Sequence, residues 1–194
     1  MAARPSLRPA DRLLEAATRL FALHGIHTVG IDQIIAAAGV AKSSLYQAFG
    51  SKEALVVAYL EHQDAADRAA YRAAVTGVHA GAERVLTSFD LAIAGAGRRS
   101  YRGCLYLNAA TEFPEAGHPV AEAVETHRAW VRARWSEALG DRGPERDSLI
   151  ERIQILYDGG IAGVKCARST APIVLARAMA AELLDADVSH KTPR

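Results

Sequence analysis

The chain has few of the features that mark a secreted, disulfide-held or membrane protein. It contains only two cysteines, Cys104 and Cys166, in 194 residues, which is too few for a disulfide framework. No apolar run approaches the roughly 20 residues that a membrane-spanning helix needs, and no apolar segment follows the basic N-terminal residues as it would in a secretory signal. These absences favour a cytoplasmic protein, without a membrane partner, whose cysteines are reduced and packed as small apolar residues.

Strand patterns and enzyme motifs are also missing from the sequence. No stretch alternates polar and apolar residues between hairpin turn signals, whereas alanine is abundant and β-branched runs are short, which favours helix. The patterns HExxH, CxxC and GxSxG and the glycine-rich phosphate loop do not occur. We therefore expect an all-α protein that is not an enzyme and that carries no cofactor and no metal.

The charge of the chain is nearly balanced. The net charge is +1 and half of the residues are hydrophobic, so the chain can bury a substantial core, and its total charge neither requires nor excludes nucleic acid. Residues 1–53 hold six basic and four acidic residues, a net charge of +2, and the remaining residues are at −1. The basic excess is modest, and a clear basic stripe would be stronger evidence for nucleic acid.

The most informative stretch is residues 31–52, which read IDQIIAAAGVAKSSLYQAFGSK. Gly39 lies in its middle, where the chain reverses direction and positive φ is favoured. A helix, a short glycine-containing turn and a second helix form the helix-turn-helix motif, whose second helix enters the DNA major groove. Four apolar residues recur at helical spacing and form one inner face across both helices: Ile34, Ala38, Val40 and Leu45.

These residues also carry a family resemblance. The segments LLEAATRLFALHGIHTVGIDQIIAAAGV and GVAKSSLYQAFGSKEAL resemble the DNA-binding signature of TetR-type transcriptional regulators over most of residues 9–56. The pattern VGxDxIIAxxGVAK and the later segment GCLYLNAATEFPEAGHPV resemble one subgroup of that family. The similarity spans nearly the whole chain, and it is strong in the first third and loose after it.

The helical pattern and the resemblance together predict about nine helices in two domains. Residues 1–52 are expected to form a helix-turn-helix DNA-binding domain, and residues 53–194 a helical ligand-binding and dimerisation domain. The expected helices are Pro9–His24, Ile31–Ala38, Lys42–Phe49, a helix that starts after Ser51 and reaches about Val75, Val78–Ala96, Arg102–Phe113, Pro119–Leu139, Pro144–Ala167 and Ala171–Ala186.

The short helix over residues 42–49 is the expected recognition helix. Gln47 can make a bidentate contact to adenine, and Lys42 can donate to guanine. The resemblance implies that Tyr46 and Lys52 bind backbone phosphate, and the N–H groups that follow Gly30 at a helix start could bind another phosphate. An ordinary solvated face is the alternative for these polar side chains. The residues expected to contact DNA are Gly30, Lys42, Ser43, Ser44, Tyr46, Gln47 and Lys52.

The second domain is larger than a dimer interface requires, so we expect its helices to enclose a cavity. Apolar pockets with a few polar groups are the usual form of small-molecule sites. For each candidate residue, core packing or solvent exposure is at least as good an interpretation as ligand contact. The candidates are Tyr59, His62, Phe89, Tyr101, Cys104, Asn108, Glu112, His127, Trp130, Tyr157 and Asp158.

The last two helices are the expected dimer interface. Their apolar residues, Leu183 among them, cover too wide an arc for one buried face. Gly159, Gly160 and Gly163 weaken the first of these helices by roughly 1 kcal/mol each relative to alanine, and the close approach of another helix would explain them. Pairing through the final helices is also what the family resemblance implies.

These features predict a homodimeric transcriptional regulator that binds a palindromic operator in double-stranded DNA, because two copies related by a two-fold axis read two half-sites. The resemblance implies a repressor that is released by an unidentified small-molecule effector, which binds better to the conformation with low DNA affinity. Two other interpretations stay open: an all-helical carrier or enzyme without DNA binding, and a helical interaction module in which Tyr46 and Lys52 bind protein.

Overall fold

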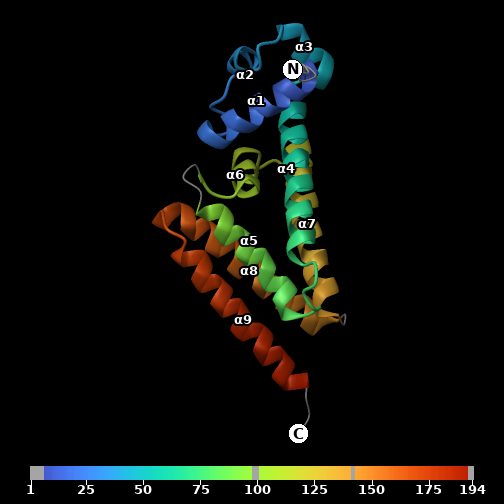
Figure 1. The fold of residues 1–194 in the computed structure, drawn as a ribbon, viewed down its shortest axis with the longest axis vertical. Helices are drawn as coiled ribbons and strands as arrows, with labels where there is room; N and C mark the ends of the chain where they lie inside the picture. Colours follow the sequence, from blue (N-terminus) through green and yellow to red (C-terminus); the bar gives the residue numbers. More distant parts are fainter. Residues whose placement is uncertain (1–6, 98–100, 141–142, 192–194) are drawn as a thin grey trace, which may run out of the picture. The chain divides into compact units, whose positions relative to one another are not determined.

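The computed structural model describes residues 7–97, 101–140 and 143–191, with side chains as far as Asp187. Over these ranges the chain is all-helical, as predicted (Figure 1). None of the helices in these ranges has the length and apolar character that crossing a membrane requires. The helices are α1 (Pro9–His24), α2 (Ile31–Ala38), α3 (Lys42–Phe49), α4 (Lys52–Ala74), α5 (Ala82–Ala96), α6 (Leu105–Glu112), α7 (Pro119–Leu139), α8 (Pro144–Ala167) and α9 (Ala171–Lys191).

Three helices differ from the bounds that the sequence predicted. Helices α5 and α6 begin later than expected, because a glycine with positive φ precedes each of them: Gly81 has φ of +109° and Gly103 has φ of +98°. Helix α9 continues to Lys191, because no glycine or proline interrupts the sequence before Pro193. The bounds of α1, α2, α3, α7 and α8 are those expected from the sequence, and α4 starts after Ser51 as expected and ends one residue before Val75.

The chain divides into two compact units. The first unit comprises residues 1–64 and 105–124, and the second comprises residues 65–104 and 125–194. Helices α4 and α7 therefore each begin in the first unit and end in the second. The first unit contains α6 as well as the three N-terminal helices, which places a segment from beyond residue 100 among the residues of the helix-turn-helix.

The first unit is held by a small apolar core and one tight turn. Gly39, between α2 and α3, has φ of +62°, which confirms the predicted left-handed turn. The Arg12 guanidinium donates to the Gly39 carbonyl at 3.0 Å, and this bond ties α1 to the turn. Phe21 packs edge-on against Tyr59, with ring centroids 5.4 Å apart. Other buried residues of this core are Leu13, Ala17, Ile26, Val29, Ile34, Ala38, Leu45, Leu55 and Val56.

The second unit is built around an aromatic cluster. Trp135 on α7 is completely buried, and its Nε1–H donates to the Ser88 hydroxyl at 3.0 Å. Tyr157 on α8 lies edge-on to both Phe89 and Trp135, at centroid distances of 5.2 and 5.7 Å. Three helices thus share one cluster, which gives this unit a core of its own.

Helices α8 and α9 approach each other closely within one chain. A Cβ atom at Gly160 would lie 2.8 Å from side-chain atoms of both Ile173 and Ala176, and one at Gly163 would lie 2.7 Å from Pro172 Cβ. These glycines are therefore explained by packing against α9 of the same chain. Gly159 has no atom within 4 Å of its ideal Cβ position, so the same explanation does not apply to it.

Replacing Gly160 by alanine is expected to lower the free energy of unfolding by about 1–2 kcal/mol. Overpacking typically costs about 1–3 kcal/mol of stability, and the better helix propensity of alanine offsets up to about 1 kcal/mol of that loss. The matched control is Gly95→Ala in α5, where the added Cβ meets no atom within 4 Å and a small gain is expected. Urea unfolding followed by circular dichroism measures both changes, and a stabilised Gly160→Ala variant would contradict the packing argument.

Candidate nucleic-acid interface

Helix α3 exposes a polar surface and is anchored to the core by one buried residue, Leu45. Leu45 is completely buried, whereas Lys42, Ser43 and Gln47 are exposed and Ser44 is half-buried. Tyr46 is 47% exposed. The helix is thus fixed from one side only, and its polar side chains are available to a partner.

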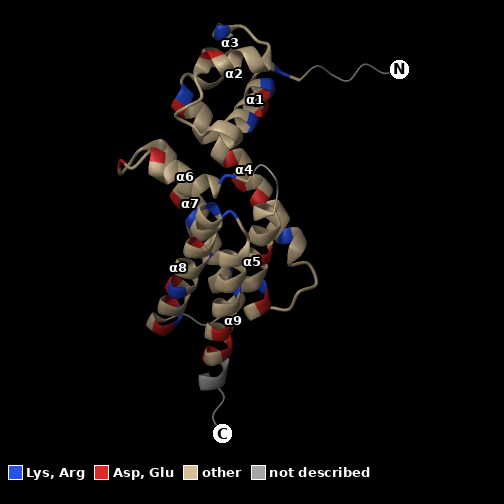
Figure 2. Ribbon diagram, turned by 90° about the vertical axis from the view of Figure 1, so that its left-hand side faces the viewer, with Lys and Arg blue, Asp and Glu red and all other residues tan. Residues whose placement is uncertain are grey.

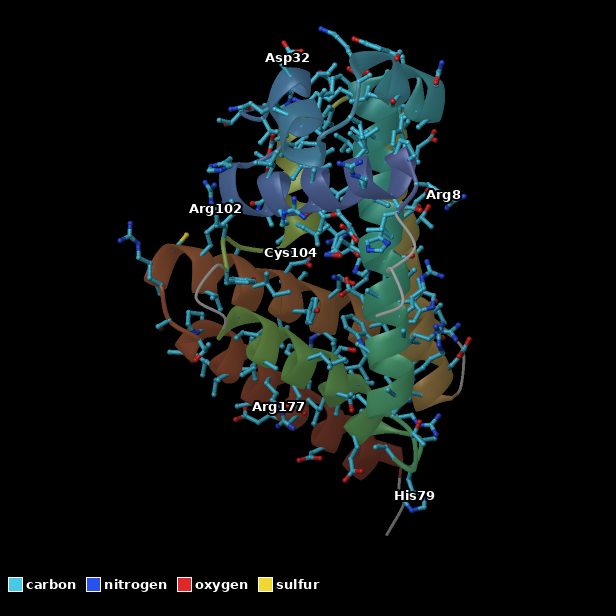
Figure 3. All side chains as sticks on the ribbon, turned by 45° about the horizontal axis from the view of Figure 1, so that its top comes forward. Arg8, Asp32, His79, Arg102, Cys104 and Arg177 are labelled. Atoms are coloured by element: carbon cyan, nitrogen blue, oxygen red, sulfur yellow. The ribbon has the colours of Figure 1, made fainter. Side chains whose placement is uncertain are left out.

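Lys42 forms an ion pair that a nucleic acid could replace. Its Nζ atom lies 3.2 Å from Asp32 Oδ1, and this hydrogen bond raises the pKa of Lys42. Both side chains are exposed, so the pair adds little stability and can open at low cost. Asp32 lies at the surface of α2 (Figure 3). The neighbouring helix α1 also carries charged residues of both signs (Figure 2).

The start of α2 is capped with the help of Gln33, which was not a candidate DNA-contact residue from the sequence. Gly30 is the N-cap, and its N–H donates to Gln33 Oε1 at 2.8 Å. The glutamine three residues after the cap is half of a capping box, and this signal is visible in the sequence. The later N–H groups of this first turn remain at the positive end of the helix dipole, where a phosphate can bind.

Lys52 joins the start of α4 to the loop between α1 and α2. Its Nζ donates to the Ile26 carbonyl at 2.8 Å. Partial burial lowers the pKa of Lys52, and the charges of Glu112 and Glu53 oppose that shift. An ammonium group has three donors, so the bond to Ile26 leaves donors for a phosphate.

Glu112, at the end of α6, binds the same loop from the other side. Its carboxylate accepts from the N–H of Ile26 at 3.2 Å and from the N–H of His27 at 2.5 Å. The His27 ring donates through Nε2 to the Glu112 carbonyl at 2.7 Å. The sequence placed Glu112 among the ligand candidates. No local signal indicated its bonds to Ile26 and His27, which lie 86 and 85 positions earlier in the chain.

The other ligand candidates of the first unit differ in their exposure. Tyr59 is buried against Phe21, His62 is exposed and Asn108 is half-buried. Tyr59 therefore has a packing role in the structure.

In the second unit, ligand candidates lie close to the aromatic cluster. Phe89 and Tyr157 belong to that cluster, and burial raises the pKa of Tyr157. Burial also raises the pKa of Tyr101 to about 12, and Cys104 contributes to both shifts. Phe89, Tyr101, Cys104 and Tyr157 therefore lie in one neighbourhood of the second unit. His127 is half-buried on α7.

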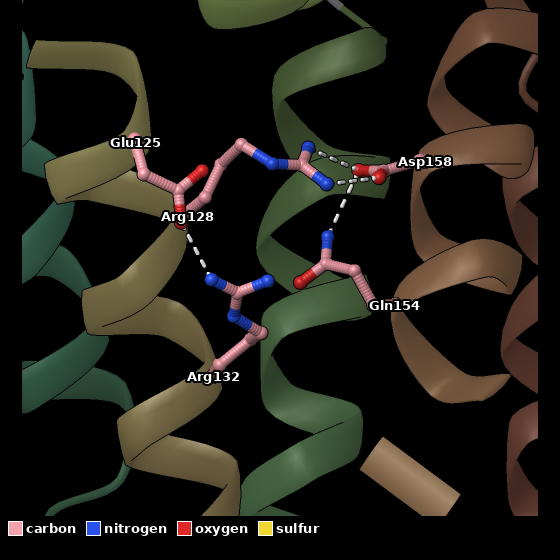
Figure 4. Close-up of polar contacts among 5 residues, drawn as sticks. All are labelled: Glu125, Arg128, Arg132, Gln154 and Asp158. Carbon is pink, nitrogen blue, oxygen red and sulfur yellow. Dashed lines mark hydrogen bonds and ion pairs between the residues drawn. The ribbon is translucent and has the colours of Figure 1, made fainter. Parts of the chain in front are cut away.

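Asp158 is held in an ion pair that joins α7 to α8 (Figure 4). Its two oxygens accept from the Arg128 guanidinium at 3.1 and 2.7 Å, and Gln154 Nε2 donates to Oδ1 at 2.9 Å. The ion pair raises the pKa of Arg128, chiefly through the hydrogen bond. Arg128 was not a candidate from the sequence, because nothing in the sequence pairs residues 30 positions apart on different helices.

Trp130, the remaining candidate, lies in a groove of the second unit that is rich in arginine. The guanidinium carbons of Arg68 and Arg134 lie 5.0 and 5.8 Å from its ring centroid, and Tyr71 lies edge-on to it at 5.6 Å. The groove is lined by Tyr71, Arg72, Val75, Arg84, Trp130, Arg134, Glu137 and Ala138.

Comparison with known proteins identifies the family. The family model described as bacterial regulatory proteins, tetR family, matches residues 13–59. The crystal structure of SCO4454, a TetR-family transcriptional regulator from Streptomyces coelicolor, is 32% identical, with a TM-score of 0.76 over 92% of this chain and 93% of that chain. The chain belongs to the TetR family. The TetR membership and fold predicted from the sequence are thus confirmed.

The curated relatives of this TetR-family protein agree with the structural match. An uncharacterized HTH-type transcriptional regulator of Mycobacterium tuberculosis strain H37Rv is 30% identical over 152 residues, which are 78% of this chain and 72% of the relative. The regulator LmrA of Bacillus subtilis is 48% identical over 48 residues, or 24% of this chain and 26% of LmrA. The protein is a DNA-binding transcriptional regulator, as the sequence predicted.

Proposed function

We propose that this TetR-family regulator is a cytoplasmic homodimeric repressor that leaves a palindromic operator when a small-molecule effector binds its second unit. The exposed polar surface of α3, anchored by buried Leu45, is the observation that carries the DNA-binding part of the proposal. A single short helix reads only a few base pairs, so a pair of them in adjacent major grooves supplies the specificity.

The side chains of α3 divide into base-reading and phosphate-binding groups. Gln47 reads an adenine through its amide. Lys42 leaves its ion pair with Asp32 and binds guanine or phosphate instead. Tyr46 and Lys52 bind phosphate oxygens, which position the helix without reading sequence. Ser43 and Ser44 add hydrogen bonds to base or backbone, and the first turn of α2 after Gly30 holds a further phosphate.

Exposed apolar side chains on α8 and α9 support dimerisation through these helices. Ile155 on α8 is 70% exposed, and Leu175 on α9 is 62% exposed. Val174 and Met179 on α9 are also exposed, so four large apolar side chains would face water in a monomer. Leu183, named from the sequence, is half-buried within the chain and is a weaker interface candidate than Leu175.

The effector site is proposed in the second unit, around the aromatic cluster and the Arg128–Asp158 pair. Phe89, Tyr157 and Cys104 offer apolar and weakly polar contacts, and Asp158 offers a partly buried charge. An effector releases DNA only if it binds the conformation with low DNA affinity better than the DNA-bound one. His127 and Trp130 remain candidates on α7.

Substitutions on α3 should separate affinity from sequence preference. Gln47→Ala is expected to relax preference at one operator position, at a cost of about 1–3 kcal/mol. Tyr46→Phe removes a phosphate contact and should weaken binding to matched and mismatched duplexes alike. Gln63→Ala, which removes an amide from α4, is the matched control. Titrations on a matched operator and single-base variants test this, and unchanged preference in Gln47→Ala would refute the role of Gln47.

The proposed function as a whole is tested by selecting bound sequences from random duplex DNA. A palindromic consensus is expected, with an affinity that falls steeply as salt rises because phosphate contacts release counterions. Small molecules that release the selected duplex then identify the effector class. Binding without a preferred palindromic sequence would refute the proposed operator.

A further inference from the structure

A clasp of hydrogen bonds holds the loop between α1 and α2 from both sides. We define the loop clasp as the Glu112 carboxylate, the Lys52 amine and the backbone of Ile26 and His27. Glu112 accepts from both N–H groups, and Lys52 donates to the Ile26 carbonyl. The carboxylate and the ammonium group thus engage opposite sides of one short backbone segment, and their charges attract each other through it.

Packing around the clasp fixes the end of α6 against the loop. The Phe113 ring packs against the imidazoles of both His27 and His118, with both centroid distances at 4.9 Å. The His118 ring is itself held, because its Nδ1 accepts from the Val120 N–H at 3.2 Å at the start of α7. Ile26, inside the clasp, is 4% exposed, so the loop backbone has little freedom to move away from the carboxylate.

Glycine at position 25 allows the backbone conformation that begins the loop. Gly25 ends α1 with φ of +87°, a conformation that other residues rarely adopt. A Cβ atom there would lie 3.6 Å from Glu112 Oε1, so the carboxylate lies against the backbone of the residue before the clasp. The positive φ of Gly25 thus directs the chain from the end of α1 into the segment that binds the Glu112 carboxylate.

The clasp acts on the part of the chain that leads into the helix-turn-helix. Residues 28–30 connect it to α2, and the Gly39 turn connects α2 to α3. Carboxylate hydrogen bonds to backbone N–H groups are among the stronger ones, and a partly buried N–H that loses its acceptor is costly. Movement of the loop therefore carries α2, and with it α3, away from the geometry that fits DNA.

We propose that Glu112 is a positioning residue for DNA binding, although it lies outside the helix-turn-helix in sequence. Its carboxylate holds the loop and thereby sets the orientation of α2 and α3; it does not contact DNA. The inference rests on DNA binding by α3, which is part of the proposed function. It adds the end of α6 to the residues that determine operator affinity.

The full-length protein with Glu112→Gln or Glu112→Ala tests the proposal. Glutamine fills the same space as glutamate but offers one acceptor oxygen instead of two. Alanine removes both acceptors. The matched control is Glu115→Gln, which makes the same charge change at an exposed residue of the α6–α7 loop. A role in packing alone predicts that the glutamine side chain works as well as glutamate at this position, whereas positioning by two hydrogen bonds predicts a graded loss.

Two measurements are made on each variant. Amide hydrogen exchange without DNA should show faster exchange at Ile26 and His27, by about tenfold or more in Glu112→Ala and by less in Glu112→Gln. Affinity for the duplex selected by the wild-type protein should fall in the same order, again by about tenfold or more for alanine. Glu115→Gln should match the wild type in both.

The outcomes separate this proposal from the proposed function. Wild-type exchange and wild-type affinity in Glu112→Gln would overturn the positioning role. Lower affinity without faster loop exchange would also overturn it, because Glu112 would then act by another route. Failure of the wild-type protein to select any duplex would count against the proposed function, and the exchange measurement would still decide whether the carboxylate holds the loop.

Discussion

Replacing Leu175 by glutamate is expected to convert the protein into a monomer that no longer selects an operator. Leu175 is among the most exposed large apolar side chains of α9, on the face proposed to pair. A two-fold interface buries the new carboxylate twice, and an unpaired buried charge costs on the order of 3–5 kcal/mol. Losing the second α3 removes the simultaneous contact with two half-sites, which contributes roughly 10²–10⁴ in affinity.

Sedimentation velocity measures the oligomeric state, and an operator titration measures the consequence for DNA. The matched control for sedimentation is Leu23→Glu, which places the same charge on an exposed leucine of α1 in the first unit and should leave the dimer intact. A Leu175→Glu protein that sediments as a dimer would show that another surface pairs. The fall in DNA affinity should then be absent as well.

Helix positions could be predicted because their signals are local. Apolar spacing and the Gly39 turn fixed α2 and α3 to the residue, and Gly39 has the positive φ that the reversal required. The starts of α5 and α6 could not be placed in the same way. Gly81 and Gly103 interrupt the helix only because their φ is positive in the folded chain, and a glycine in a sequence indicates that such a conformation is allowed, not that it is adopted.

The exposed positions of the candidate DNA surface could be predicted from the sequence, whereas the contacts of Glu112 that support this surface could not. Leu45 is the apolar residue at the inner position of α3, so Tyr46 and Gln47 had to lie on other faces. Glu112 gave no such signal, because its partners lie more than 80 positions away. Contacts of this kind depend on how the helices pack, and the spacing of residues along one helix contains no information about them.

Replacing Trp135 by alanine is expected to cause the largest loss of stability, about 3–5 kcal/mol. The side chain is completely buried against Phe89 and Tyr157, and its removal leaves a cavity that rigid neighbouring rings cannot fill. The Ser88 hydroxyl also loses the indole N–H that it accepts. Because this cluster lies in the second unit, the variant should lose effector binding before it loses the helical structure of α1 to α3.

Trp130→Ala is the matched control, since it removes the same side chain from a half-buried position on the same helix. A smaller loss, below about 2 kcal/mol, is expected there, because less apolar area leaves water when the protein folds. Urea unfolding followed by circular dichroism compares the two variants. Equal losses would mean that the aromatic cluster is not the core of the second unit, and the effector site proposed beside it would lose its structural basis.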